Sequence, residues 1–471
     1  MLLSVAVATE PHQSPVALWD PPSMADHPSQ SDLETGRIPL TAAVAAGERL
    51  FLTKFNTLDG AGRPEATGDS KPTFRQRQHG RSMIRTSGPD ANSCGGCHNQ
   101  PRAGGSGEFA VNVFVGAQFA DPPTSSIAFR DTSERNTLTM FGSSAIEMLA
   151  REMTSELLTL RRQATLQAQQ TGQPASVDLL TKGVSFGVLT GLPDGTYDAS
   201  RVEGVDEDLV VKPFGFKGVV ISLREFTINA LNQHFGVQAM ERFGWERTGV
   251  ADFDGDGVPN EFSVGQATAL TLFQAALLPH NRVSAHVQAH ARGEELFRQV
   301  GCASCHRPDL TLDATDFTEP NPYNRPGNVG PSEVRPIAVP IVVGGQGAGV
   351  ERLSSGDIVV HAFTDLKRHV ICDAGDTFFC NETRRQDRVP TEQFLTPKLW
   401  DLASSAPYGH RGDCTTLSEA IVHHAGEARD STRRFLSLAD EDKKAVVRFL
   451  LSLGEEVPPG NATSVDSRRT P

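Results

Sequence analysis

Two cysteine and histidine motifs carry the strongest chemical signal in this chain of 471 residues. They are Cys94-Gly-Gly-Cys97-His98 and Cys302-Ala-Ser-Cys305-His306. In a C-x-x-C-H motif the two thiols can add to the vinyl groups of one porphyrin, and the histidine can bind its iron. A chain of this composition would contain on the order of 0.003 such motifs by chance. The sequence therefore predicts two covalently bound c-type haems.

Zinc binding and dithiol redox chemistry are the other uses of paired cysteines. A zinc ion needs four donors around a tetrahedron, which two C-x-x-C pairs could supply together. A redox dithiol gives no reason for a histidine directly after both pairs. Haem attachment explains both histidines, and its usual place is the bacterial periplasm or another extracytoplasmic space.

The rest of the composition limits the compartment and the partners. The net charge of -13 argues against nucleic acid and anionic membrane as partners. No segment approaches the ~20 apolar residues of a transmembrane span. Residues 1–8 (MLLSVAVA) resemble the end of a secretory signal peptide with an A-x-A cleavage site. We therefore expect an exported bacterial protein, periplasmic or otherwise extracytoplasmic.

The segments before the two motifs repeat each other. Gly47–Phe51 (GERLF) and Gly293–Phe297 (GEELF) each follow an Ala-rich stretch that favours helix. Cys302 comes five residues after the second copy, as in a cytochrome c helix that leads into its haem loop. In the first copy Cys94 comes 43 residues after Phe51, so a long loop is expected there. The repeat predicts one haem domain in each half.

Helical patterns outnumber strand patterns along the chain. Apolar residues recur at helical spacing over 146–160, and this stripe ends near Gly172. Ser437 and Asp440 fit a capping box for a helix that Gly454 would end. The strand-like runs are short, at 219–223 and 339–343. The expected fold class is mainly α: two cytochrome c-like haem domains with long loops and minor β pieces.

Four segments are expected along the chain. An N-terminal extension with a signal remnant covers 1–36. The first haem domain covers 37–280, with insertions and a D-x-D-x-D-G loop, and the second covers 281–455. A disordered polar tail covers 456–471.

With these residues placed, the sequence resembles the bacterial di-haem oxidoreductase family. That family includes proteins described as peroxidases or thiol oxidoreductases and is related to the di-haem cytochrome c peroxidases. The resemblance spans 40–455 and is carried by 94–107, 141–154, 214–236, 252–261, 301–310 and 396–428. The last segment resembles the family pattern T-P-x-L-W-G-L … A-P-Y-x-H-D-G … E-A-I-x-x-H-x-G-E-A. Asp401 replaces a usual Gly there, and Arg411 replaces a usual Asp.

The resemblance also implies how the second haem is ligated. Related di-haem peroxidases take the distal ligand of the C-terminal haem from the segment after A-P-Y-x-H-D-G. That segment holds His423 and His424, and alignment on 426–428 puts His424 in the ligand position. His369 and His410 are further candidates, and either could instead hydrogen-bond a propionate. An iron with ligands on both faces mainly transfers electrons, whereas an open face can bind peroxide.

The distal side of the first haem has five candidates: Met140, Met148, Met153, His79 and His234. A methionine on a helix is more often a packing residue than a ligand. Glu147 lies where related peroxidases place a distal acid, and a desolvated carboxyl can take and return a proton during peroxide cleavage. The alternative interpretation of Glu147 is a surface residue on an amphipathic helix.

A separate metal loop is predicted at 252–261 (DFDGDGVPNE), because D-x-D-x-D-G resembles a calcium-binding loop. The expected ligands are the carboxylates of Asp252, Asp254 and Asp256, the carbonyl of Val258, and Glu261 or Asn260. An EF-hand would have Glu at position 12, where this chain has Ser263. A Ca²⁺ ion here would brace the joint between the halves, and a polar turn without metal is the alternative.

Three cysteines lie outside the haem motifs. Cys372 and Cys380 are eight residues apart, and in an oxidising compartment we expect them to pair. Cys414 is then left over and is expected to be buried.

Three functions fit these features. The first is a peroxidase-like di-haem oxidoreductase. A small donor protein of cytochrome or cupredoxin type would feed one haem, and the haem of His98 would reduce peroxide or another small oxidant. The second is an electron carrier with two six-coordinate haems and no substrate. The third is a haem protein that oxidises another protein or a polymer at long range. Fold analogy alone does not choose among them.

Overall fold

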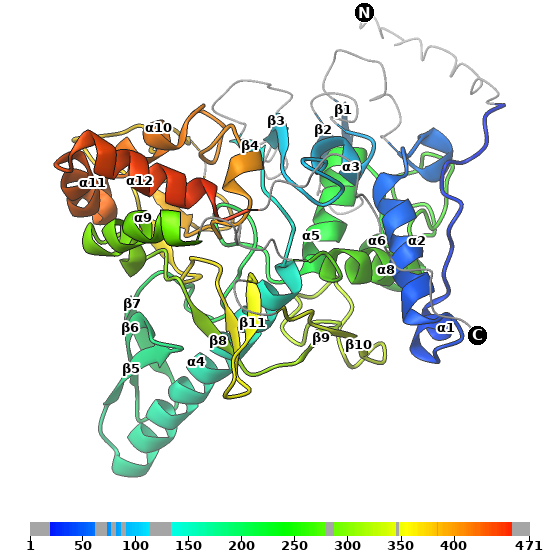
Figure 1. The fold of residues 1–471 in the computed structure, drawn as a ribbon. Helices are drawn as coiled ribbons and strands as arrows, with labels where there is room; N and C mark the ends of the chain where they lie inside the picture. Colours follow the sequence, from blue (N-terminus) through cyan, green and yellow to red (C-terminus); the bar gives the residue numbers. More distant parts are fainter. Residues whose placement is uncertain are drawn as a thin grey trace, which may run out of the picture.

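The computed structural model describes residues 19–61, 73–76, 82–85, 91–113, 133–278, 287–344, 348–383 and 385–454. Two groups of helices lie at opposite sides of the molecule (Figure 1). The first comprises α1 (Gln30–Glu34), α2 (Leu40–Leu52), α3 (Cys94–Cys97), α5 (Leu223–Ala230), α6 (Met240–Phe243), α7 (Trp245–Thr248) and α8 (Val264–Ala275). The second comprises α9 (Val287–Gln299), α10 (Leu417–Val422), α11 (Arg429–Leu436) and α12 (Asp440–Leu451). The signal-like residues 1–18 and the tail 456–471 lie outside the described residues.

Each group is built on the same helix crossing. α2 packs against α8, and α9 packs against α12. A Cβ atom at Gly47 would lie 2.0 Å from the carbonyl oxygen of Ala269 on α8. A Cβ atom at Gly293 would lie 2.1 Å from the carbonyl oxygen of Ala445 on α12. Only glycine lets these backbones approach so closely, which is why both copies of the repeat begin with it.

The phenylalanine of each repeat packs beside its glycine. The ring of Phe51 lies 5.2 Å from that of Phe273, and the ring of Phe297 lies 5.5 Å from that of Phe449. Both pairs are tilted, at 56° and 59°, a geometry that aromatic pairs favour. The predicted internal repeat is therefore confirmed as two equivalent helix crossings.

One apolar core joins the two halves. It contains Leu149 and Met153 of α4 (Ser143–Thr171), which starts near the middle of the molecule (Figure 1). The same core contains Leu310, Phe317 and other residues from the second half. The halves thus share buried surface instead of folding as two separate bodies.

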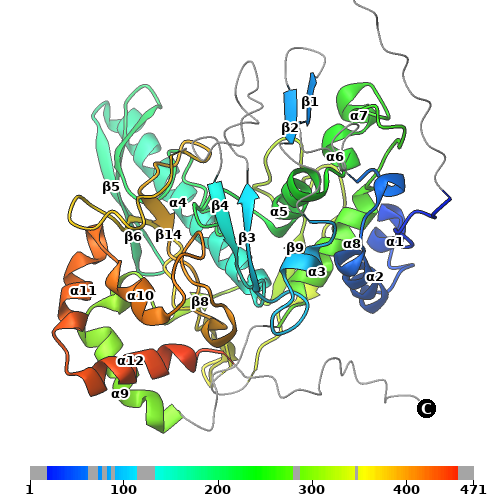
Figure 2. The same cartoon turned by 90° about the horizontal axis from the view of Figure 1, so that it is seen from above.

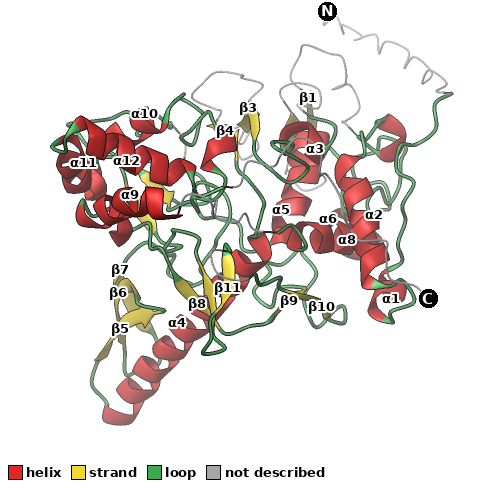
Figure 3. Ribbon diagram, viewed as in Figure 1, coloured by secondary structure: helices red, strands yellow, loops and turns green. Residues whose placement is uncertain are grey.

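The strands are short, antiparallel and scattered among the helices (Figure 3). Those before residue 210 are β1 (Thr73–Gln76), β2 (Ser82–Arg85), β3 (Gly107–Val113), β4 (Ser133–Thr137), β5 (Ala175–Thr181), β6 (Val184–Gly191) and β7 (Tyr197–Val202). The later ones are β8 (Leu310–Leu312), β9 (Asp316–Glu319), β10 (Ile337–Pro340), β11 (Val350–Arg352), β12 (Ile358–Val360), β13 (Arg368–Val370) and β14 (Gln393–Leu395). β3 and β4 lie between the two helix groups (Figure 2). β5, β6 and β7 form one sheet against α4, and β11, β12 and β8 form another.

The expected fold class is confirmed only in part. Helix makes up 36% and strand 17%, so the molecule is mixed α/β and not clearly mainly α. The run at 219–223 is not a strand: Val220 forms a single bridge to Phe214, and Ser222 then caps α5. None of the helices in the described part of the chain has the length and apolar character to cross a bilayer.

The predicted end of one helix is confirmed, and both predicted ends of another are wrong. The stripe at 146–160 lies in α4, which ends at Gly172 in the left-handed conformation as expected. The capping box of α12 is wrong, because Ala439 is its N-cap and Ser437 closes α11. α12 also ends at Leu451, before Gly454.

Candidate functional site: two C-x-x-C-H motifs and the cavity beside the first

The first C-x-x-C-H motif begins with a single helical turn. Ser93 caps α3 by accepting a hydrogen bond from the Gly96 amide at 3.0 Å. His98 follows directly, and its amide donates to the Cys94 carbonyl at 2.9 Å. This local turn joins the backbone of the first cysteine of the motif to that of its histidine.

The ring of His98 is held through one nitrogen. Nδ1 lies 3.2 Å from the carbonyl oxygen of Gly105, which favours the tautomer whose lone pair is on Nε2. Phe51 lies beside the ring, with 6.4 Å between centroids and 53° between planes. Removal from water lowers the pKa of His98 to about 4, so its imidazole is neutral at pH 7. A neutral imidazole with its lone pair on Nε2 is the form that binds iron.

The second motif repeats this geometry. It opens with the 3-10 turn η5 (Cys302–Ser304), and the His306 amide donates to the Cys302 carbonyl at 3.0 Å. Nδ1 of His306 lies 3.0 Å from the carbonyl oxygen of Phe363. Phe297 lies 6.4 Å away at 53°, the same values as in the first motif. Removal from water, followed by the charge of His424, lowers the pKa of His306 to about 4.

A shared zinc site does not fit this arrangement. Within the residues that the structure describes, no group of metal-ligating side chains joins thiols of both motifs. Cys94 packs beside the core of the first helix group, and Cys302 packs beside that of the second. The expected disulfide joins Cys372 to Cys380, and Cys414 is buried as expected.

A cavity of about 810 Å³ lies beside His98. Its walls include Phe51, Cys94 and Cys97 as well as the histidine. Pockets for small molecules and cofactors usually measure ~300–1,000 Å³. Two thiols, a neutral imidazole and a cavity of this size in one place fit a c-type haem.

Two of the five distal candidates for the first motif line this cavity. They are Met140 and His234. His234 lies on the π-helical turn η3 (Leu231–Phe235) that continues α5, and its charge lowers the pKa of His98 further, after desolvation. Met148 and Met153 pack into the shared core instead. His79 lies outside the described residues.

Near the second motif the structure separates His424 from His423. Nδ1 of His424 lies 2.7 Å from the Ala420 carbonyl oxygen, again the arrangement that favours a lone pair on Nε2. His423 instead stacks on Phe378 at 3.8 Å, and its Nδ1 lies 3.0 Å from Asp376. The two residues therefore differ: His424 has the Nδ1–carbonyl contact also seen at His306, whereas His423 pairs with a carboxylate.

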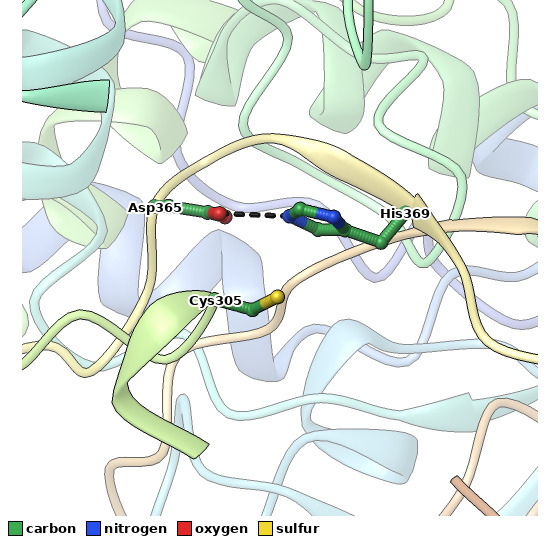
Figure 4. Close-up of side chains that lie close together, drawn as sticks. All are labelled: Cys305, Asp365 and His369. Atoms are coloured by element: carbon green, nitrogen blue, oxygen red, sulfur yellow. Dashed lines mark hydrogen bonds and ion pairs between the residues drawn. The ribbon is translucent and has the colours of Figure 1, made fainter. Parts of the chain in front are cut away.

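His369 has both ring nitrogens engaged. Nε2 lies 2.8 Å from Asp365, and Nδ1 lies 2.7 Å from Glu427, with Cys305 close to the ring (Figure 4). Burial opposes the charged form, but hydrogen bonds with Asp365, Cys305 and Glu427 raise the pKa of His369 to about 11. A protonated imidazole has no lone pair for iron, and both of its N–H groups already face carboxylates of the chain.

His410 is also placed away from a ligand position. Its Nε2 lies 2.8 Å from the side-chain oxygen of Asn381, and its ring packs 4.4 Å from that of Phe394. Burial, followed by the charges of Arg135 and Lys217, lowers the pKa of His410 to about 2. The residue is a buried, neutral hydrogen-bonding group.

Glu147 is fully buried in the shared core. Its Oε1 accepts from Asn321 at 2.8 Å and from Arg151 at 3.1 Å, and its Oε2 accepts from the Leu223 amide at 2.8 Å. It is not among the residues that line the cavity. The alternative interpretation of Glu147 as a surface residue is wrong, because the side chain is fully buried. Its role as the distal acid of the first haem gains no support from the cavity beside His98, which it does not line.

A second carboxyl, Glu225, was not predicted from the sequence, and it does line the cavity. Its Oε2 accepts from the Ile221 amide at 2.7 Å, and Oε1 lies 3.6 Å from Arg325. Burial raises the pKa of Glu225 above its usual value. The only sequence pattern around Glu225 is Ser222-Leu-Arg-Glu225, which is typical of a helix N-terminus and not of a functional site. In the structure Ser222 does cap the helix, because its Oγ accepts from the Glu225 amide at 3.0 Å.

The predicted metal loop brings its three aspartates together. Carboxylate atoms of Asp252, Asp254 and Asp256 all lie within 4.8 Å of one another. Glu261 is buried nearby, and desolvation followed by the charge of Asp254 raises its pKa to about 10. Ser263, at EF-hand position 12, caps α8 and so is engaged elsewhere. The amide of Val258 donates to Asp256 at 2.8 Å.

No protein-family model matches the chain. Over 166 residues it is 26% identical to the cytochrome-c peroxidase IdrP2 of Denitromonas iodatirespirans. The matched segment covers 35% of this chain and 39% of that protein.

Two solved structures show weak similarity to this chain. Hydrazine synthase from Kuenenia stuttgartiensis has a TM-score of 0.38 at 13% identity, with 95% of this chain and 99% of that chain covered. A MauG-like protein associated with microbial copper homeostasis has a TM-score of 0.28 at 15% identity, with 56% and 77% covered. At these scores neither structure defines the fold. What the comparisons establish is that about a third of this chain is similar to a cytochrome-c peroxidase.

Proposed function

We propose that this protein is a di-haem c-type oxidoreductase with peroxidase-like chemistry. One observation carries the proposal: both C-x-x-C-H motifs follow the same glycine-dependent helix crossing, and both histidines are held through Nδ1 by a backbone carbonyl. Two copies of this helix crossing and histidine contact are what two copies of one prosthetic group would require. The partial similarity to a cytochrome-c peroxidase supports the reaction class.

The two equivalent motifs indicate which residues would hold the haems. The thioether bonds would come from Cys94, Cys97, Cys302 and Cys305, the proximal ligands would be His98 and His306, and the second ligand of the second haem would be His424. His369 would lie beside the second motif as a group that pairs with Asp365 and Glu427 of the chain itself.

A bound haem supplies the iron redox chemistry, namely acceptance of electrons from a donor protein and reduction of peroxide or another small oxidant. The chain supplies the proton. Glu225 is the better-placed acid, because it lines the cavity, its Oε2 accepts from the Ile221 amide, and burial raises its pKa above the usual value. Glu147 stays a prediction from the family resemblance.

An electron carrier is the second candidate function. His234 lines the cavity and interacts electrostatically with His98. If it bound the first iron, both haems would have two histidine ligands and neither would offer an open face.

Spectroscopy of protein matured in a host that attaches c-type haem tests both functions. The oxidoreductase requires two haems per chain by pyridine haemochrome and one high-spin haem that reacts with peroxide. Two low-spin haems that stay inert to peroxide after half-reduction would establish the carrier. Cys94→Ser with Cys97→Ser should halve the haem content, whereas Cys414→Ser should leave it unchanged.

The proposal includes the partner and the compartment. The electron donor would be a small redox protein of cytochrome or cupredoxin type, and the protein would act in the periplasm or another extracytoplasmic space. The disulfide between Cys372 and Cys380 fits an oxidising compartment. Fractionation of the native host by detection of the holoprotein tests this location.

We also propose that the aspartate loop binds Ca²⁺. The ligands would be Asp252, Asp254, Asp256, the Val258 carbonyl and Glu261, all ordinary oxygen donors for this ion. Calorimetry with Ca²⁺ should show one site that Asp254→Asn abolishes. If Asp254→Asn binds Ca²⁺ with the same heat signal as the wild type, the loop is not the binding site and is a polar turn without metal.

A further inference from the structure

The cavity beside His98 is strongly cationic in an acidic protein. Six positive side chains line it: Arg135, Arg242, Arg325, Arg385, Arg388 and Lys398. Among the described residues only Glu225 and Asp387 line it with negative charge, so six positive and two negative groups leave a net charge of +4. The whole chain has a net charge of -13. The positive charge of the cavity therefore reflects how charged residues are placed around it and not the overall composition.

The layer behind the cavity wall does not reverse this sign. Glu382 pairs with Arg135 at 2.5 Å, but it also pairs with Lys217 at 3.2 Å, and the two outer charges cancel. Asp401 faces Lys398, and Arg102 in turn faces Asp401. Behind Arg242, Glu241 and Glu319 share the single positive charge of Arg224, so this pair removes at most one unit of the excess. An excess of positive charge therefore remains inside.

The propionates of a haem account for only part of this charge. One haem brings two carboxylates, so a cavity of +4 would still hold +2. Peroxide is neutral and would need no such field. The remaining charge calls for a second anionic occupant.

Two of the cations are held in place next to each other. The guanidinium of Arg242 donates to the side-chain oxygens of Asn229 and Asn328, each at 2.8 Å, so neutral groups orient it. Arg325 is oriented by Asp387 at 2.6 Å, and its Nε lies 3.6 Å from the Glu225 carboxylate. Burial lowers the pKa of Arg242, the charges of Glu241 and Glu225 raise it, and the charge of Arg325 lowers it. An anion that reaches both guanidinium groups would gain charge-assisted hydrogen bonds from each.

We propose that the cavity binds a small anion, an inorganic oxyanion or a short carboxylate, between Arg242 and Arg325 beside the first haem. This inference rests on the proposed function and names the class of its second substrate. The anion would sit next to Glu225, the residue that can supply a proton. The exposed Arg388 would attract the anion at the entrance.

Azide and imidazole are the probes for the holoprotein. Azide is a small anion, whereas imidazole is mostly neutral at about pH 8. Optical titration should show azide affinity that falls as salt is added, because screening weakens attraction by exposed charges, and imidazole affinity that does not. Arg242→Gln and Arg325→Gln should each weaken azide binding about tenfold and leave imidazole within about twofold.

Control variants distinguish an anion site from cations that serve only the haem propionates. Arg433→Gln on the exposed side of α11 should change neither probe. If Arg242→Gln misfolds, Arg388→Gln on the surface should still slow azide association about threefold. Equal weakening of both probes, or loss of haem without selective loss of azide, would mean that the cations serve only propionates and would overturn the proposal.

Calorimetry with azide measures binding without the haem spectrum, so the two proposals can fail separately. Two haems per chain with no effect of the arginine variants on azide would refute the anion site alone. A chain without covalent haem would refute the proposed function, and the calorimetric Kd in the same variants would still decide the anion site.

Discussion

At the scale of single residues, two buried carboxyls differ in what surrounds them. Glu147 is satisfied by Arg151, Asn321 and a backbone amide, whereas Glu225 lines the cavity. We expect Glu225→Gln to lower kcat for peroxide reduction by about a hundredfold, since a positioned acid contributes ~10²–10⁴. Glu147→Gln should instead lower the free energy of unfolding, because it leaves Arg151 buried without its charge partner.

Steady-state kinetics and chemical denaturation of both variants check this contrast. Haem content per chain serves as the control for correct maturation. The opposite pattern, with Glu147→Gln inactive but stable and Glu225→Gln active, would restore the acid expected from the sequence.

His369 gives a pH dependence with a definite sign. Its pKa is raised from 6.5 to about 11 in the folded protein, so its pairing with Asp365 and Glu427 stabilises the fold fully below pH 6.5 and is lost as pH rises through about 11. The difference in free energy of unfolding between wild type and His369→Gln should therefore shrink steadily as pH rises from about 7 to about 9. Parallel stability curves over that range would show that His369 is not held in its charged form.

Local spacing explains which residues could be predicted. The C-x-x-C-H motifs and the D-x-D-x-D-G loop are contiguous, so their chemistry is visible in the sequence. Glu225 and the cavity cations come from segments far apart, and nothing in the pattern around each one marks it. Asp401 has φ 66°, in the left-handed region, which explains physically why Gly is usual at that position.

At the scale of elements, the loop closed by Cys372 and Cys380 holds the segment that carries His424. The Ala425 amide donates to the Ile371 carbonyl at 3.0 Å, and the Gly426 amide donates to Asp373 at 2.9 Å. Phe379 packs edge-on against the ring of His424, 5.7 Å away. We infer that this loop keeps His424 in the position from which it is proposed to bind the second haem.

Removal of the disulfide should therefore alter the second haem. In Cys372→Ser with Cys380→Ser we expect the low-spin EPR signal of that haem to weaken in favour of a high-spin signal. His424→Ala should abolish the same low-spin signal, and Cys414→Ser is the matched control. If His424→Ala changes the spectrum but the double variant does not, the loop has no part in ligation.

Elements with regular patterns were easier to predict than contacts between loops. The helices around both repeats and α4 follow from apolar spacing and glycine positions. The pairing of the disulfide loop with 423–428 depends on contacts about fifty residues apart, which no local pattern encodes. The same limit explains the misplaced cap of α12, where two adjoining helices compete for Ser437.

At the scale of the whole molecule, the shared core should make unfolding cooperative. Phe317, from the second half, is fully buried in the same core as Leu149 of α4, and Arg151 lies 5.1 Å from its ring. Arg224 and Glu319 add a buried ion pair between the halves at 2.8 Å. Separate domains would show two heat-absorption peaks, whereas one core predicts a single transition.

Phe317→Ala tests this coupling, because loss of a buried phenylalanine typically costs ~3–5 kcal/mol. Calorimetry should show the single transition moved to a lower Tm, and the optical changes of both haems should move with it although Phe317 belongs to the second half. Leu180→Ala, an exposed leucine on β5, should leave the Tm unchanged. In the opposite outcome, the signal of the first haem would change at the wild-type temperature and that of the second haem at a lower one. That result would show that the two halves unfold independently despite their common core.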